Sequence, residues 1–453
     1  MTGGLNKTTS YLAIAAAASL MIAGVAFVPA TARAADLGGD CCADLESRVA
    51  ELEATTVRKG NKKVSVTLSG AVTSAILFWN DGIENDANVI TPDTIGGGFT
   101  FAGSGKIGRD ITAGFNLNFD ARFGDPGDGS GLQPDNVTLD ANGDPVGGYQ
   151  AVGKIAPSEV WVYVDSKSLG RLTMGHRSSA YKSANGASDL GGDSGANAYN
   201  GGIIDLAAGI QIRDVGATPG TGFNGSWYNA LDNAGGGVDS VRGMSVRYDS
   251  PSIGGFTFAA SLGHKDNQRN SPLHPFTGAD DVYSAAVGYS GTHGGTDVSL
   301  SAAVQNATEA ANGAAPPLTV TDSRWLIGGS LYNKSSGLFI TGEYDGVTLN
   351  AATNASSNNW FVKGGWHKNV NGAGETGIYG GFERSHDVAI VGVTGSGYFI
   401  GVTQAFDSAA SVAYFQFQHL SASENAAALA KLCKGGTGCA DESSAVMGLK
   451  VSF

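Results

Sequence analysis

Apolar and polar residues alternate along many segments of the chain. In residues 111–123 every second side chain is apolar, and Asn116, Asn118, Asp120 and Arg122 lie among the polar positions. A period of two is that of a β-strand with one apolar and one polar face. Sixteen segments follow this pattern, most of them longer than the roughly five or six residues of an average strand. We therefore predict an all-β fold with strands at 64–79, 99–109, 111–123, 155–165, 169–176, 241–250, 255–265, 281–290, 295–306, 324–333, 336–347, 358–367, 374–385, 395–406, 409–420 and 444–453.

The connections between these segments alternate in length. Residues 124–154 and 177–240 are long, whereas 166–168 and 251–254 are short, and the same order continues to the C-terminus. Outer-membrane β-barrels have short periplasmic turns, longer external loops and an even number of strands. The sequence therefore predicts a transmembrane antiparallel β-barrel of sixteen strands. Residues 202–229 also alternate, so a barrel of eighteen strands is the alternative.

The two faces of each predicted strand indicate which side meets the solvent. In lipid every backbone N–H and C=O must be paired, so a sheet crosses the membrane only as a closed barrel with its apolar face outward. We therefore expect Phe115, Leu117 and Phe119 to face the acyl chains and Asn118 and Asp120 to face the lumen. A soluble β-sandwich would bury the apolar set instead. The sorting of connections by length favours the barrel.

The N-terminal residues 1–34 have the features of a secretory signal peptide. Lys7 precedes an apolar run, and Ala32, Arg33 and Ala34 fit an A-x-A cleavage site before Ala35. The first 34 residues are therefore expected to be removed on export.

Residues 35–60 are expected to form a periplasmic helical segment ahead of a barrel domain at 61–453. Leu45, Val49, Leu52 and Thr56 follow a 4-3-4 spacing. This pattern fits a three-chain coil or one amphipathic helix in the barrel mouth, and the sequence favours neither. Crosslinking through Cys41 and Cys42 distinguishes the two, because only the coil gives trimer-sized covalent species.

Charge and cysteine content narrow the possible partners. The chain of 453 residues has a net charge of −13, and removal of Lys7 and Arg33 makes it −15. An acidic chain is poorly suited to bind nucleic acid. Cys433 and Cys439 are close enough in sequence to form a disulfide in an oxidising compartment. We predict no metal site and no cofactor.

Both ends of the predicted barrel carry a family resemblance. The final strand ends on Phe453 and resembles that of bacterial outer-membrane porins, in which a terminal Phe is the signal read by the barrel-assembly machinery. Residues 40–82, 158–176 and 246–263 resemble the general porins of alphaproteobacteria. The resemblance implies a usually trimeric diffusion channel in the outer membrane, among lipid and lipopolysaccharide, whose third long loop folds into the lumen. Here that loop is unusually long and rich in glycine.

Sixteen strands enclose an aqueous channel, so charges on its wall and in its loop are candidate functional groups. We expect residues 177–240 to form the constriction loop, with carboxylates that include Asp189, Asp193 and Asp205. For each charge the alternative is a solvated position far from the narrowest level. The loop holds three basic and six acidic residues, which together with the net charge predicts weak cation preference. Alternation places on the pore wall Arg122, Arg171, Arg247, Lys363 and Asp120.

No catalytic pattern accompanies these features. The seven histidines are scattered, and neither G-x-S-x-G nor H-E-x-x-H occurs. We therefore predict a passive diffusion channel for ions and small hydrophilic solutes rather than an enzyme. Two alternatives remain at this point: a substrate-specific channel, which would need a line of aromatic residues down the lumen, and a structural or adhesive surface barrel.

Overall fold

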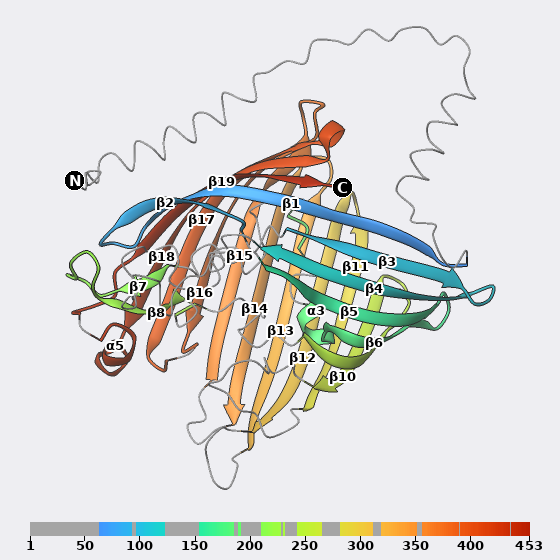
Figure 1. The fold of residues 1–453 in the computed structure, drawn as a ribbon, viewed down its shortest axis with the longest axis horizontal. Coiled ribbons are helices and arrows are strands. Elements are labelled where there is room, and N and C mark those ends of the chain that lie inside the picture. The colour runs from blue at the N-terminus through green and yellow to red at the C-terminus, as the bar shows by residue number, and fades with distance from the viewer. Residues whose placement is uncertain are drawn as a thin grey trace, which may run out of the picture.

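A closed antiparallel sheet forms the body of the protein (Figure 1). The structure is a computed structural model that describes residues 63–92, 97–122, 154–184, 189–191, 210–227, 230–231, 242–264, 281–310, 319–350, 356–388, 390–434 and 436–453. The predicted signal peptide, the segment 35–60 and Cys41 and Cys42 therefore lie outside the described residues. Within the described part of the chain no helix has both the length and the apolar character needed to cross a membrane.

The sheet has sixteen strand positions, as the sequence predicts. Strands β2 and β3 both pair with β1 and together occupy the second position, and β19 pairs with β1 to close the barrel. In Figure 1 the near strands β1, β3 and β4 cross in front of the far strands β12 to β15. The strands are β1 Ser65–Asn80, β2 Asn85–Ile90, β3 Gly98–Lys106, β4 Ile111–Arg122, β5 Lys154–Ser166, β6 Gly170–Ser178, β9 Arg242–Asp249, β10 Phe256–His264, β11 Asp281–His293, β12 Thr296–Ala310, β13 Thr319–Asn333, β14 Leu338–Asn350, β15 Ser356–Asn369, β16 Glu375–His386, β17 Val393–Phe406, β18 Ser411–Glu424 and β19 Glu442–Ser452.

The eighteen-strand alternative is wrong. The alternating segment contributes β7 (Gln211–Arg213), which pairs with β8 (Phe223–Ser226) in a separate two-stranded sheet. Short helices lie at α3 (Ala180–Ala184) and α5 (Ala426–Leu432). The hairpin is therefore an addition to the barrel and not part of its wall.

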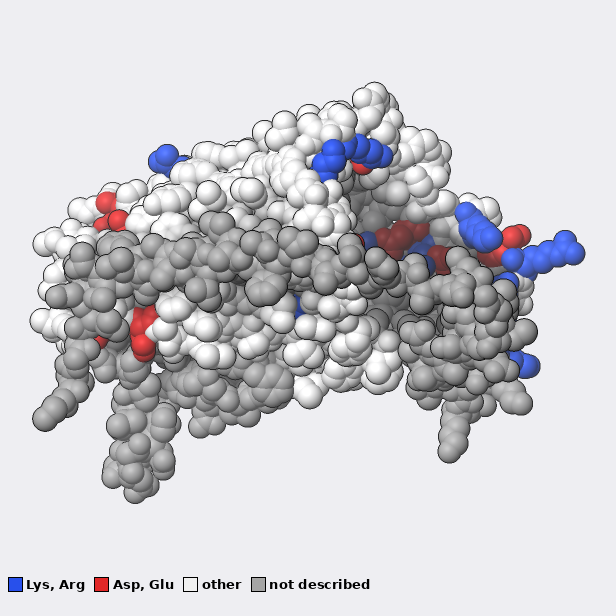
Figure 2. All heavy atoms as spheres, turned by 90° about the horizontal axis from the view of Figure 1, so that it is seen from above, with Lys and Arg blue, Asp and Glu red and all other residues white. Residues whose placement is uncertain are grey.

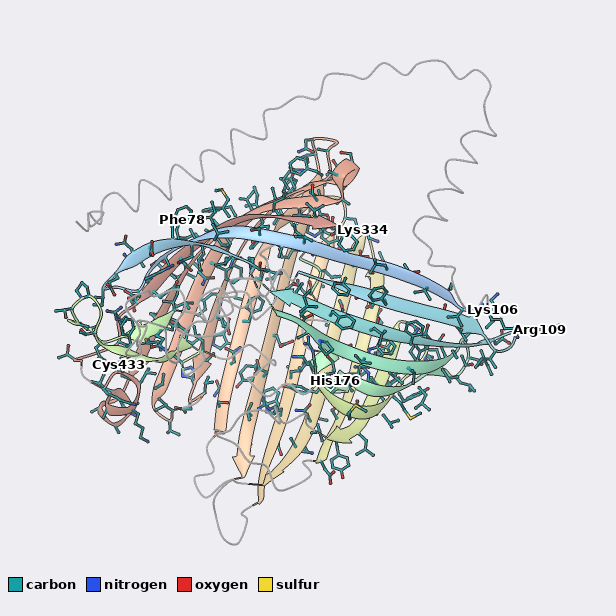
Figure 3. The ribbon with its side chains drawn as sticks, viewed as in Figure 1. Phe78, Lys106, Arg109, His176, Lys334 and Cys433 are labelled. Carbon is teal, nitrogen blue, oxygen red and sulfur yellow. A yellow bond between two sulfur atoms is a disulfide. The ribbon has the colours of Figure 1, made fainter. Side chains whose placement is uncertain are left out.

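Short turns gather at one end of the barrel. Gly294 and Gly295 alone separate β11 from β12, and both have positive φ angles, of 58° and 81°. A two-residue turn of this kind suits glycine because the absence of Cβ permits left-handed backbone. Figure 3 shows Lys106 and Arg109 at the β3–β4 turn and Cys433 far from them in the β18–β19 connection.

Burial follows the inverse of the rule for soluble proteins. On β15, Asn359 and Lys363 are 0% and 1% exposed, whereas Ile327 and Ile400 on neighbouring parts of the sheet are 58% and 56% exposed. Phe115, Leu117 and Phe119 share the outward face with Val162, which is 55% exposed. The prediction that the apolar face points outward is confirmed, and the soluble sandwich is excluded.

Aromatic rings lie against glycines on the inner face of β14 to β19. Tyr379 pairs across the strands with Gly401, Phe399 with Gly381, and Tyr414 with Gly448. A Cβ at Gly381 would stand 2.5 Å from Cζ of Phe399. Glycine therefore leaves the room that these rings occupy, a form of packing that supports glycines within strands.

Adding a methyl group under one of these rings tests the packing. Gly401→Ala should lower the free energy of unfolding by about 1–3 kcal/mol, because Cβ would collide with the buried Tyr379 ring. Urea unfolding in lipid vesicles, followed by tryptophan fluorescence, measures the change. Gly364→Ala is the control, since Gly364 faces outward and its Cβ would meet only Phe339 O, at 3.6 Å. Equal effects of the two substitutions would contradict this account.

Candidate channel constriction

Strands β6 and β9 carry a group of arginines on their inner face, beside polar and aromatic side chains of β5. Nε of Arg171 donates to Asp165 Oδ1 at 2.9 Å, and its guanidinium lies 4.5 Å from the centre of the Tyr163 ring. Arg247 is buried and donates from Nη2 to Asp249 Oδ1 at 2.6 Å. Both positions were predicted from alternation, and the structure places both on the inner face beside a carboxylate.

Sequence reasoning missed a third arginine of this group. Arg177 donates to Asp249 Oδ2 at 3.1 Å and lies 4.8 Å from the centre of the Trp161 ring. It was assigned to the loop because the predicted strand stops at residue 176, whereas β6 continues to Ser178. Arg177 has an odd residue number, as do the inward-facing Arg171 and Thr173. Continuing the alternation by one residue would therefore have placed it on the inner face.

The loop that follows β6 begins against the barrel wall. The backbone N–H of Ala180 donates to Ser261 Oγ and Ser284 Oγ, both at 3.0 Å. Nη1 of Arg247 donates to the carbonyl of Ser179 at 3.0 Å and also contacts Ser183 Oγ. Small hydroxyl side chains on β10 and β11 thus leave room for α3 on the inner face and supply acceptors for its first N–H groups.

Farther along the loop, Asp189 meets a predicted wall cation. Nζ of Lys363 donates to Asp189 Oδ2 at 2.5 Å, and Thr341 Oγ1 donates to Asp189 Oδ1 at 2.9 Å. The Lys363 side chain is 0% exposed and that of Asp189 is 14% exposed. The next residue, Leu190, donates its N–H to Ser330 Oγ and accepts from His367 at its carbonyl. These contacts attach the loop to β13, β14 and β15.

The last described part of the loop also lies against the inner wall. Ile210 packs with Leu77 and Tyr414, and Trp227 and Leu231 belong to a cluster with the inward rings of β15 to β17. Residues of the segment 177–240 therefore contact the inner wall at several places around the barrel. Asp193 and Asp205 lie outside the described residues.

Two further predicted wall residues lie on β4. Asp120 stands 3.9 Å from Nη1 of Arg242. Arg122 ends the strand, and its side chain lies outside the described residues. Seen from above, acidic and basic side chains gather in a hollow, while most of the described surface around them is neither (Figure 2).

The comparisons with known proteins bear on this arrangement. The sequence profile described as Gram-negative porin matches residues 13–425, most of the chain. The chain belongs to this family. The porin is therefore an outer-membrane channel and not an enzyme, and its sixteen-stranded barrel is the fold expected of the family. No match was found among curated protein sequences.

Solved structures of low identity share the fold. The anion-selective porin of Comamonas acidovorans has 14% identity and a TM-score of 0.53, covering 86% of this chain and 100% of that one. OmpF of Salmonella typhi in complex with daunomycin has 12% identity and a TM-score of 0.51, covering 87% and 99%. A trimer form of OmpT from Vibrio cholerae has 11% identity and a TM-score of 0.50, covering 86% and 100%.

The porin also carries inward carboxylates that sequence reasoning missed. Glu343 on β14 and Glu383 on β16 both stand opposite Phe361 of β15, and all three are buried. One row farther along, Asp345 accepts from Asn359 Nδ2 at 3.4 Å. These carboxylates could have been found, because they occupy alternate positions that face the lumen in predicted strands. The polar groups of this inner wall thus form cross-strand rows between β14 and β16.

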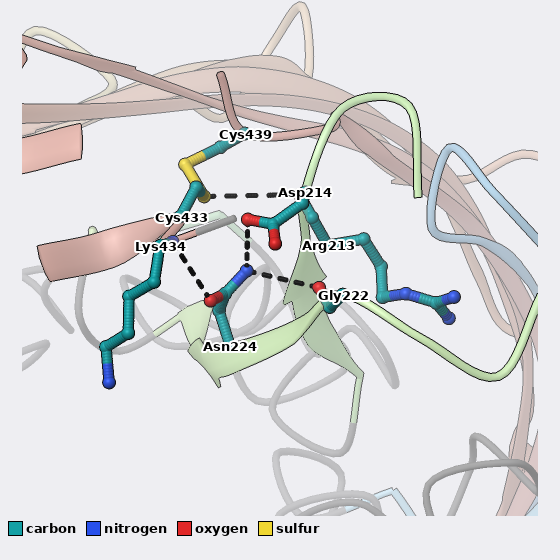
Figure 4. The surroundings of a disulfide bond; sticks show 7 residues. All are labelled: Arg213, Asp214, Gly222, Asn224, Cys433, Lys434 and Cys439. Atoms are coloured by element: carbon teal, nitrogen blue, oxygen red, sulfur yellow. Dashed lines mark hydrogen bonds between the residues drawn. A yellow bond between two sulfur atoms is a disulfide. The ribbon is translucent and has the colours of Figure 1, made fainter. Parts of the chain in front are cut away.

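The predicted disulfide of the porin is confirmed. Cys433 and Cys439 are bonded, with a Cα–Cα distance of 5.5 Å (Figure 4). At the other end of the last strand, Phe453 exchanges two backbone hydrogen bonds with Gly70, each of 2.9 Å. The action of Phe453 as an assembly signal stays a prediction.

A double-mutant cycle tests the contact between loop and wall. Lys363→Met alone should cost about 3 kcal/mol of unfolding free energy, because it leaves the Asp189 carboxylate in a water-poor site without its cation. Adding Asp189→Leu should restore most of that loss. The matched control is the Lys334–Asp297 pair, in which the lysine side chain is 53% exposed, and its coupling should be much smaller than that of the buried pair. Equal coupling energies in the two cycles would show that the contact between loop and wall stabilises the protein no more than an exposed ion pair does.

Proposed function

We propose that this porin is a passive diffusion channel for ions and small hydrophilic solutes with a weak preference for cations. The observation that supports it best is a closed barrel whose inner wall and inserted loop both carry charged groups, with Lys363 on Asp189 joining the two. Charges on facing walls of a narrow passage order water and penalise apolar solutes. The groups we assign to this field are Asp120, Arg171, Arg247, Lys363 and Asp189.

The cation preference rests on the balance of these charges. Arg171, Arg247 and Lys363 each have a carboxylate oxygen within 2.9 Å, so their positive charge is offset locally. Strands β14 and β16 add Glu343 and Glu383 to the inner wall. With the mature charge of −15, this makes the interior favour cations. Anion selectivity is a property of the Comamonas acidovorans porin and is not transferred to this chain.

The position of the aromatic residues favours a general pore over a substrate-specific one. Phe339, Phe361, Tyr379 and Phe399 lie on neighbouring strands and are at most 6% exposed. They pack against Trp227 and Leu231 of the loop rather than lining a path for solutes. A structural or adhesive barrel would conduct no current.

The assembly and surroundings are part of the same proposal. We expect a homotrimer, supported by the trimer form of the OmpT structure, set in outer-membrane lipid and lipopolysaccharide after delivery by the barrel-assembly machinery. We also propose that the chain belongs to the alphaproteobacterial subgroup of general porins, because the sequence of residues 40–82 resembles theirs. Neither Asp193 nor Asp205 is needed for this proposal, although both remain expected in the constriction loop.

Reversal potentials test the cation preference. In a planar bilayer under a KCl gradient, the potential should have the sign of K⁺ permeating faster than Cl⁻. Glu343→Gln should move it toward zero, because one inward carboxylate is lost. Asp110→Asn is the control, since Asp110 is exposed on the short β3–β4 turn. A potential of the opposite sign would overturn the preference and leave the channel intact.

Liposome swelling tests the general pore. With a series of sugars, entry rates should fall smoothly as solute size rises, because no residue pattern selects one sugar. A single sugar that enters far faster than smaller ones would instead establish a substrate-specific channel.

A further inference from the structure

The β7–β8 hairpin of the loop lies between the β1–β2 turn and the β18–β19 connection. Its residue Arg213 contacts the turn, and its backbone from Arg213 to Val215 contacts the connection. These two contacts come from segments more than one hundred residues away on either side. The hairpin is therefore fixed by both ends of the barrel sequence.

Arg213 is the centre of the first contact. Its side chain is fully buried, and Nη1 donates to Asp81 Oδ2 at 2.8 Å and to Glu84 Oε2 at 2.7 Å. Nε donates to the Thr221 carbonyl at 2.9 Å, and the guanidinium lies 3.9 Å from the centre of the Phe223 ring. One guanidinium thus satisfies acceptors in both the turn and the hairpin. A lysine would keep the charge but lose the planar fork that makes these contacts together.

The disulfide ring, residues 433–439, makes the second contact. The N–H of Val215 donates to the Gly438 carbonyl, and that of Ala440 donates to the Arg213 carbonyl, at 2.9 and 2.8 Å. On the other side of the ring, Lys434 N–H donates to Asn224 Oδ1 at 3.4 Å (Figure 4). The crosslink holds the ring in the shape that presents these groups.

The ring and the hairpin are in close contact. A Cβ at Gly436 would lie 2.9 Å from Cβ of Asp214 and 3.1 Å from the nitrogen of Val215. The same connection carries α5, whose Leu432 packs with Trp227 just beyond β8. The ring therefore covers the hairpin closely, with no space for a side chain at Gly436.

We propose that Arg213 and the Cys433–Cys439 ring form a clasp that sets the position of the β7–β8 hairpin in the channel mouth and thereby sets the conductance. Arg213 is a positioning residue, acting through the hairpin on the passage. Opening the clasp by charge removal, by a bulky residue at Gly436 or by reduction of the disulfide releases the hairpin and alters the current. The proposal rests on the diffusion-channel function proposed above.

The reductive opening of the clasp is a two-electron step. A dithiol attacks the Cys433–Cys439 bond through a mixed disulfide, and its second thiol then displaces the remaining cysteine. The protein disulfide gains two electrons and two protons and becomes two thiols, while the dithiol becomes a cyclic disulfide. No other reactant is required.

Reduction of the folded channel is the sharpest test. Dithiothreitol added to single wild-type channels in a planar bilayer should change the conductance, or the open fraction at raised voltage, by roughly twofold. The double variant Cys433→Ser with Cys439→Ser should already show the altered current and should not respond to dithiothreitol. That variant keeps Cys41 and Cys42, so its lack of response assigns the effect to the ring.

Substitutions test the two contacts separately. Arg213→Gln and Gly436→Val should each give the same altered current as the reduced channel. Arg213→Lys should give a current between that value and the wild-type current. Lys431→Gln, an exposed cation of α5, is the matched control. Heat-modified mobility on gels confirms that each variant is folded. The clasp proposal would be wrong if the folded variants gave wild-type currents. It would also be wrong if the current stayed unchanged in channels whose disulfide is shown to be reduced by thiol labelling. A wild-type chain without any conductance would instead refute the channel function.

Discussion

The pairing of every backbone polar group within the sheet is the constraint on which the rest of this structure depends. Hydrocarbon offers no hydrogen bonds, so an open edge in the membrane would leave a row of unsatisfied N–H and C=O groups. The β1–β19 pairing, from Ala71 with Ser452 to Asn80 with Ser443, removes that edge. Once the sheet is closed, each strand has one side in lipid and one in the lumen, and the alternation of the sequence follows from that geometry.

Closure also shapes the interior. The inner wall holds small hydroxyl residues where α3 lies, rings against glycines on β14 to β19, and cross-strand rows of charged groups between them. The hydroxyl residues accept hydrogen bonds from the start of the inserted loop, and the rings pack against Trp227 and Leu231 of the loop. Polar contacts at its start and apolar contacts farther along thus hold the described part of the loop against the wall.

The sequence was sufficient to predict features that repeat from strand to strand. It was insufficient to predict contacts that occur only once between distant residues. Alternation located the barrel strands and their outward faces because that periodicity is imposed on every strand by the lipid. It missed β2, whose six residues Asn85–Ile90 are half polar and do not alternate over a long run, and it ended β6 before Arg177. It placed Lys363 on the wall and Asp189 in the loop, but their contact joins residues 174 apart in sequence and no local pattern encodes it. The cysteine pair was predictable because it spans only six residues.

The two hydrogen bonds between Gly70 and Phe453 lie at the seam of the barrel. Because the first strand pairs with the last, the barrel cannot close until the C-terminal strand has been delivered. A polypeptide that lacks β19 would keep a free edge on β1 and on β18, and free edges readily join other chains. Closure of the barrel therefore requires the last strand. A chain without that strand is directed toward aggregation rather than toward a leaky pore.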